Sequence, residues 1–300
     1  MHATVTGSAV TRSVVSQVVS YLKCALLAGG ILQASVCQAV AQSEEPTLKP
    51  EPLEVSAAAA EKFEAMSRLA GRTQIFVLQA DNEIPAVLQP EPLIKYGDET
   101  RNIKESTVWV WTHESIPVAF QKIEVNVWNG PEHPFWTFCM ASLSEHRLKF
   151  SWPFRSEPFF SDPVVFQPLP GDASLPSADA LLQLKLRSEA RKFSIIETHG
   201  KQTFETRLLP QPMMQFSGSK PMRKGAVFGF AIGTNPDVQL ILRGVPAGEQ
   251  TLRAEYGMAR MTSFGVSVNY LEEQLISLKG ESPGDHGTWG YFFARAGVSD

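Results

Sequence analysis

Two short polar stretches on either side of a tryptophan-rich segment are the residues of this sequence best suited to proton transfer. Asp98 and Glu99 precede the segment, and His113 and Glu114 follow it. Carboxyl and imidazole groups that lie close together can act as general acid and base, and two facing carboxyl groups can cleave a glycosidic bond. The same residues are typical of two solvated turns. We prefer the turn interpretation, because the sequence does not bring the two stretches together.

Tryptophans form the second group of candidate residues. Trp109 and Trp111 alternate with Val108 and Val110, which predicts a strand covered on both faces and therefore a core role for both tryptophans. Trp128 is different, because it precedes Asn129-Gly130-Pro131 in an expected loop. An exposed indole on an exported sheet protein can stack on a sugar ring, so Trp128 is the candidate ligand-binding residue.

Other catalytic patterns are incomplete. Gly265-Val266-Ser267-Val268-Asn269 lacks the second glycine of a serine hydrolase elbow. The histidines after residue 42 do not form a pair at metal-ligand spacing; they are His113, His133, His146, His199 and His286. A phosphate-binding glycine loop is also missing. We therefore expect no metal and no cofactor, and we lean towards a protein that is not an enzyme.

The first 41 residues are typical of an export signal. They contain Arg12 and Lys23 but no acidic residue, and an apolar run leads to Ala39-Val40-Ala41. A signal peptidase accepts small side chains at these two positions, so we expect cleavage after Ala41 and a secreted or periplasmic protein. A transmembrane anchor is the alternative, but glycine, serine and glutamine interrupt the run, and no later segment is apolar enough to span a membrane.

The rest of the chain is expected to be a Pro/Glu-rich extended leader, residues 42–55, followed by a single β-rich globular domain, residues 56–300. Only Cys139 remains beyond the signal, so no internal disulfide is possible, and its apolar surroundings predict a buried, inert thiol rather than a nucleophile. Because acidic residues outnumber basic ones, 31 to 27, we expect no nucleic-acid partner.

The distribution of apolar residues predicts an α+β fold. We expect a curved antiparallel β-sheet, in the form of a sandwich or partial barrel, with one long helix over residues 177–198 packed on it and a short N-terminal helix over residues 57–69. Lys122, Glu124 and Asn126 alternate with Ile123, Val125 and Val127, which predicts a strand with one wet face and one dry face. No internal repeat is evident.

Several motifs in a fixed order resemble those of a family of uncharacterised secreted proteins from planctomycete bacteria. The motifs are Glu91-Pro92-Leu93-Ile94-Lys95-Tyr96, Trp109-Val110-Trp111-Thr112 with Pro117, Ala141-Ser142-Leu143-Ser144, Trp152-Pro153, Arg207-Leu208-Leu209-Pro210-Gln211-Pro212, Gly225-Ala226-Val227-Phe228-Gly229-Phe230 and Gly233-Thr234-Asn235-Pro236-Asp237. In that family the first motif usually ends in Arg-Trp and continues with Ser-Asn-Pro, whereas this chain has Lys95-Tyr96-Gly97-Asp98. The resemblance implies an exported single domain and no known activity.

Export, a β-rich fold and abundant aromatic residues together favour a non-catalytic extracytoplasmic binding or interaction domain, with a glycan or an envelope protein as partner. Two alternatives remain open at this stage. One is a hydrolase that uses carboxylates such as Asp98, Glu99 and Glu114, and the other is a purely structural component of the envelope.

Overall fold

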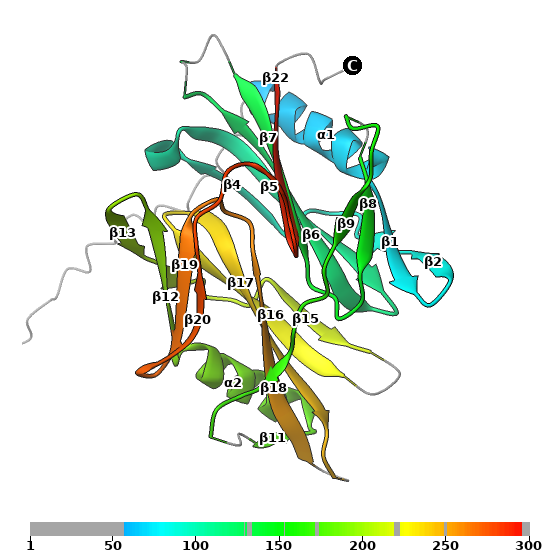
Figure 1. Ribbon diagram of the computed structural model, residues 1–300, viewed down its shortest axis with the longest axis vertical. Coiled ribbons are helices and arrows are strands. Elements are labelled where there is room, and N and C mark those ends of the chain that lie inside the picture. The colour runs from blue at the N-terminus through cyan, green and yellow to red at the C-terminus, as the bar shows by residue number, and fades with distance from the viewer. Residues whose placement is uncertain are drawn as a thin grey trace, which may run out of the picture. The chain divides into compact units, whose positions relative to one another are not determined.

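Antiparallel strands and two helices make up the part of the chain that the structure describes (Figure 1). The computed structural model describes residues 57–295, except 129, 131–133, 153, 172–173, 219–222 and 249–250. The expected signal peptide and leader lie outside the described residues. Neither described helix is long and apolar enough to cross a membrane.

The elements follow one another in two series with the same order. The first series is α1 (Ala57–Arg72), β1 (Gln74–Gln79), β2 (Asn82–Pro85), β3 (Val87–Leu88), β4 (Ile94–Asp98), the 3-10 helix η1 (Glu99–Arg101), β5 (Ile103–His113), β6 (Ile116–Asn126), β7 (Phe135–Ser142), β8 (Leu148–Ser151) and β9 (Phe159–Ser161). The second series is α2 (Asp179–Ala190), β12 (Phe193–His199), β13 (Gln202–Glu205), β14 (Arg207–Leu208), β15 (Met214–Ser217), β16 (Lys224–Ile232), β17 (Asn235–Pro246), β18 (Thr251–Arg260), β19 (Gly265–Tyr270) and β20 (Glu273–Leu278). Four strands lie outside the two series: β10 (Gln167–Pro168), β11 (Ser174–Pro176), β21 (Gly284–His286) and β22 (Trp289–Arg295).

Each series forms one small and one large antiparallel sheet. The small sheets have the orders β2-β1-β8-β9 and β13-β12-β19-β20. The large sheets are built around β5-β6-β7 and β16-β17-β18, and β22 extends the first while β10 and β11 extend the second. The chain is therefore an internal repeat of one helix-and-two-sheet unit.

This repeat corrects the expectation that the sequence holds none. Pro90-Glu91-Pro92 and Pro210-Gln211-Pro212 stand at matching places, and Leu93 and Met213 just after them donate equivalent backbone hydrogen bonds to Val108 and Val227. The first turn of each unit also contains a residue with positive φ, Ala80 in one and Gly200 in the other. Turns and proline positions persist, whereas the side chains between them have diverged, and this divergence hides the repeat from a comparison of sequence alone.

The helices differ from the expectation of one long helix packed on a sheet. The first helix, α1, spans 16 residues and the second, α2, only 12. The second ends at Ala190, and Phe193 already belongs to β12. Phe193 continues the three-to-four-residue spacing of Leu182, Leu186 and Ala190, so helical periodicity runs past the true end of the helix. In Figure 1, α1 lies by β5 and α2 by β16 and β17.

Three apolar clusters fill the fold. One lies on the α1 side of the first large sheet and contains Trp109 and Trp111. A second occupies the equivalent place in the other unit. The third contains residues of both large sheets, among them Val108 and Val110. The prediction that the Trp-Val-Trp strand is covered on both faces is confirmed, and Cys139 is buried as expected.

The return strand β6 differs from its expected pattern of one wet and one dry face. Lys122, Glu124 and Asn126 are all buried, together with the alternating Ile123 and Val125. The covering groups come from the other unit, because Lys122 contacts Asp237 of β17. Local periodicity contains no information about a sheet that lies more than a hundred residues later in the chain.

Candidate functional site

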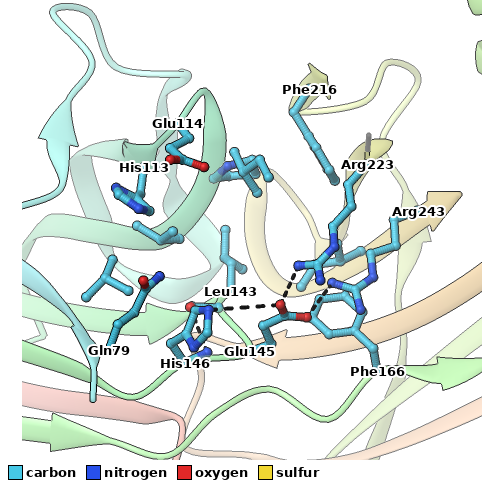
Figure 2. A pocket seen from close by; sticks show the side chains of 16 residues that line it. Gln79, His113, Glu114, Leu143, Glu145, His146, Phe166, Phe216, Arg223 and Arg243 are labelled. Atoms are coloured by element: carbon cyan, nitrogen blue, oxygen red, sulfur yellow. Dashed lines mark hydrogen bonds and ion pairs between the residues drawn. The ribbon is translucent and has the colours of Figure 1, made fainter. Parts of the chain in front are cut away.

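Two cavities of similar size lie where the two units meet. One holds about 280 Å³ between the end of β6 and the start of β17, and we call it the Lys122 pocket. The other holds about 270 Å³ between the start of β6 and the end of β17, and we call it the Arg243 pocket (Figure 2). The repeat makes the two pockets equivalent in position. Their side chains differ.

Buried polar side chains form the floor of the Lys122 pocket. Lys122 Nζ donates hydrogen bonds of 2.9 Å to both Asn235 Oδ1 and Asp237 Oδ1, and it lies 3.4 Å from Glu124 Oε1. The Tyr96 hydroxyl is 2.7 Å from Asn235 Oδ1 and 3.0 Å from Glu124 Oε1. Every one of these groups has a partner, which is the condition for burying charge without a large loss of stability.

A second cation extends this network. Arg101, from η1, donates through Nη1 to Asp237 Oδ2, and its Nη2 lies 3.5 Å from Glu197 Oε2. Thr262 Oγ1 also donates to Glu197 Oε2, at 3.4 Å. Arg101 and Thr262 line the cavity, whereas Glu197 is not among its lining residues.

Burial and neighbouring charges shift the pKa values of Glu197 and Lys122. Burial raises the pKa of Glu197 to about 8, and the negative charge of Asp237 adds to the effect while Arg101 and Lys122 oppose it. Burial lowers the pKa of Lys122, but Asp237 and Glu124 outweigh it and raise that pKa above its usual range. Two cations, Lys122 and Arg101, thus face the carboxyl groups of Glu124 and Asp237 in the floor, and the raised pKa of Glu197 disfavours a further negative charge beside them.

Aromatic side chains form the rim of the Lys122 pocket. Trp128 is 50 % exposed, and its Nε1 donates a 2.7 Å hydrogen bond to the carbonyl oxygen of Arg101, which fixes the indole. Its ring contacts Phe135 edge-on at 4.9 Å between centroids and Phe293 at 6.1 Å. Phe293 is also well exposed. The sequence candidate Trp128 therefore lies at the mouth of a polar cavity.

One polar atom of the Lys122 pocket has no partner within the described residues. Asn126 lines the cavity and is fully buried, and its Nδ2 donates to Thr137 Oγ1. Its Oδ1 accepts no hydrogen bond from any described group. A buried acceptor without a donor loses about 1–3 kcal/mol of stability, and this atom is enclosed by its neighbours, since Asn126 is fully buried.

The Arg243 pocket has a different set of charges. Glu145, between β7 and β8, receives hydrogen bonds from Arg223 Nη1 and, at 3.1 Å, from Arg243 Nη1. Figure 2 shows Glu145 at the floor beside these two arginines, with His113 and Glu114 on the facing wall. Burial opposes ionisation of Glu145, but the hydrogen bonds and charges of both arginines prevail and hold its pKa below the usual range.

The sequence candidates fall into separate places. Asp98 caps η1 by accepting from the Thr100 backbone N–H at 3.1 Å, and Glu99 follows it. His113 and Glu114 lie at the opposite end of β5. An eleven-residue strand spans about 33 Å, so the four residues do not form one catalytic group. Within the described residues, no cluster of three or more histidine, cysteine, aspartate or glutamate side chains could hold a metal ion.

Sequence reasoning singled out Trp128, His113 and Glu114, which line the pockets, but it missed the charged residues on the two pocket floors. The alternating pattern predicts a solvated face for Lys122 and Glu124, and Glu145 and Arg243 belong to segments far apart in the chain. The paired proline motifs are the available signal, since a recognised repeat would have predicted a second sheet against β6. No family model, curated protein or solved structure matches this chain.

Proposed function

We propose that this chain is an exported, non-catalytic domain that binds a saccharide in the Lys122 pocket. The observation that carries the proposal is a fully buried polar floor beneath a half-exposed tryptophan. The export part rests on the pattern of the first 41 residues, and the binding part rests on the geometry of the pocket.

The polar floor favours an uncharged ligand rich in hydroxyl groups. Lys122 and Arg101 offset Glu124 and Asp237, so a strongly charged ligand gains little from the floor as a whole. A hydroxyl group both donates and accepts, and it can therefore complement a surface on which donors and acceptors alternate.

The rim and the size of the cavity favour a ring. Sugar rings carry apolar C–H faces that pack on aromatic side chains, and Trp128 and Phe293 offer such faces at the mouth. Ligand pockets usually hold about 300–1,000 Å³, so about 280 Å³ suits a single sugar unit. Further units of the same glycan would then extend over the exposed indole.

A glycan array followed by calorimetry on the purified protein tests the proposal. Trp128→Ala should lower the affinity for the best glycan at least about tenfold, since buried tryptophan anchors commonly contribute 2 kcal/mol or more. Phe160→Ala is the matched control, because Phe160 is similarly exposed and lines neither pocket. A blank array would reject saccharide binding and favour an envelope protein or a structural role. Equal affinities of wild type and Trp128→Ala would reject the site.

A carboxylate-dependent hydrolase is the second candidate, and the raised pKa of Glu197 favours it. A protonated carboxyl next to an ionised one is the arrangement that separates a general acid from a base. Against it, Asp237 already contacts two cations, and Glu197 is not a lining residue. The hydrolase would be favoured if the protein released reducing sugar from a bound glycan. Glu197→Gln should then abolish this release without loss of glycan binding.

A further inference from the structure

We propose that the Arg243 pocket is a second binding site, for a small carboxylic acid with a ring-shaped body, and that the ligand displaces the carboxylate of Glu145 from Arg223 and Arg243. This inference does not rest on the saccharide proposal, because no residue lines both pockets.

Two arginines, Arg223 and Arg243, and two glutamates, Glu114 and Glu145, line this pocket. Arg243 donates to Glu255 through Nε and Nη2 at 3.0 and 2.8 Å, in addition to Glu145. Arg253 also donates to Glu255, at 2.8 Å, but it does not line the pocket. Of the two lining glutamates, only Glu145 accepts hydrogen bonds from the two lining arginines, and Arg223 Nε is buried without a partner among the described residues. Two guanidinium groups thus converge on one carboxylate position in the cavity, and such a position favours an anion.

Glu145 shows which kind of anion the arginine pair accepts. Its two carboxylate oxygens each take a hydrogen bond from a different arginine, Oε1 from Arg223 and Oε2 from Arg243. The planar guanidinium group matches carboxylate geometry. A ligand carboxylate can therefore replace that of Glu145 atom for atom.

The position of Glu145 allows this exchange. It lies outside the strand ladders, between β7 and β8, so its side chain can rotate away without breaking strand pairing. Its side chain is 29 % exposed, whereas that of Arg243 is only 10 % exposed. The carboxylate of Glu145 is thus the more accessible member of the pair, whereas Arg243 is held in place by its hydrogen bonds to Glu255.

The remaining walls favour a ring next to the carboxylate. Phe166 supports the Arg243 guanidinium at 3.6 Å from its ring centroid, so that this donor is already oriented before a ligand arrives. Phe216 and Ile241 add apolar surface, while Gln79 and His113 supply polar groups on the facing wall (Figure 2). A volume of about 270 Å³ holds one ring with its carboxylate.

Calorimetry with benzoate and D-glucuronate on the purified protein tests the inference, with benzyl alcohol, D-glucose and sulfate as comparison ligands. We expect at least one of the two acids to bind, and the one that binds shows whether the ring is aromatic or a sugar. The neutral counterparts, benzyl alcohol and D-glucose, should not bind. Arg223→Gln should weaken binding at least about tenfold, because it removes a charge-assisted hydrogen bond to the ligand carboxylate. Arg253→Gln is the control and should stay within about twofold.

Glu145→Gln provides the more specific test. It removes the carboxylate that competes with the ligand for the two arginines, so the ligand should bind more tightly. The affinity of Glu145→Gln for the carboxylic acid should be about tenfold higher than that of the wild type, because the arginines are then available for binding in a larger fraction of the molecules. The same ligand should raise the melting temperature of Glu145→Gln more than that of the wild type. Binding of sulfate alone, equal binding of acid and neutral counterpart, no binding at all, or no gain in Glu145→Gln would each overturn the inference.

Discussion

Lys122 Nζ and Asp237 Oδ1 lie 2.9 Å apart, although Lys122 belongs to the first unit of the repeat and Asp237 to the second. Both side chains are almost fully buried. Arg101 contacts the other carboxylate oxygen of Asp237, so a single aspartate joins two cations at the junction. The two units are therefore held together by charge as well as by the apolar cluster between the large sheets.

Lys122→Met should destabilise the fold by about 3–5 kcal/mol, because it removes one partner of a buried ion pair and leaves the carboxylates of Asp237 and Glu124 poorly compensated. Urea unfolding measures this change. The double variant Lys122→Met with Asp237→Leu should lose less than the sum of the single variants, since it removes both charges of the pair.

The control for this prediction is Lys149→Met. Lys149 donates to Glu83 at 2.8 Å in an exposed pair, and such pairs contribute about 0–1 kcal/mol. If Lys122→Met and Lys149→Met lowered the free energy of unfolding equally, the buried junction would not hold the units together.

Local patterns in the sequence were enough to predict the central strand. Alternation of tryptophan and valine from Val108 to Trp111 identified a ribbon covered on both faces, and the apolar surroundings of Cys139 predicted its burial. These predictions succeed because each depends on the immediate neighbours of a residue. The β-rich antiparallel character follows from the same local information.

The junction between the units depends on contacts that no local pattern contains. Lys122 was expected to face water because Lys122, Glu124 and Asn126 are polar, yet Asn235 and Asp237 cover it. The end of α2 was missed for a related reason, since Phe193 fits helical spacing while pairing with Tyr270 in a sheet. Candidate residues on two ends of β5 could not be separated before the length of that strand was known.

Two glycines should respond oppositely to alanine. A Cβ at Gly225 would lie 2.5 Å from Leu242 O and 2.5 Å from a Phe216 ring carbon, whereas one at Gly71 would meet nothing within 4 Å. We expect Gly225→Ala to lower the free energy of unfolding by about 1–3 kcal/mol. Gly71→Ala should raise it by about 0.5–1 kcal/mol, since Gly71 lies in α1. Urea titrations of both variants decide, and a neutral Gly225→Ala would contradict the close approach of β15, β16 and β17.

Cys139 should be inert in the folded protein. It is fully buried, and burial raises the pKa of its thiol above the usual range, with Lys122 opposing and Glu124 adding to that effect. The thiolate is the reactive form. In a variant with Cys24→Ser and Cys37→Ser, which leaves Cys139 as the single thiol, labelling with Ellman's reagent should require unfolding and accelerate in urea along with the loss of structure. Rapid labelling of one thiol in native buffer would show that the central cluster opens readily.

Glu197 should make the protein less stable as the pH rises from about 4.5 to 8. Its pKa is about 8 in the folded state and 4.5 ordinarily, so in this window the folded protein holds a proton that the unfolded chain has released. The unfolded state then binds fewer protons, and the contribution of Glu197 to stability falls by about 1.4 kcal/mol per pH unit until it levels off above pH 8. Glu197→Gln should remove this slope in urea titrations at pH 5, 6, 7 and 8.

Glu189→Gln is the matched control for the pH dependence. Burial disfavours its ionised form, but hydrogen bonds from Lys185, Tyr270 and Lys192 lower the pKa of Glu189 to about 2. The stability that Glu189 supplies is complete above about pH 4.5 and is lost only as the pH falls towards 2. Between pH 5 and 8 its removal should therefore shift stability by a constant amount and leave the slope unchanged. A slope that survives Glu197→Gln, or disappears in Glu189→Gln, would mean that another group holds the proton at the junction.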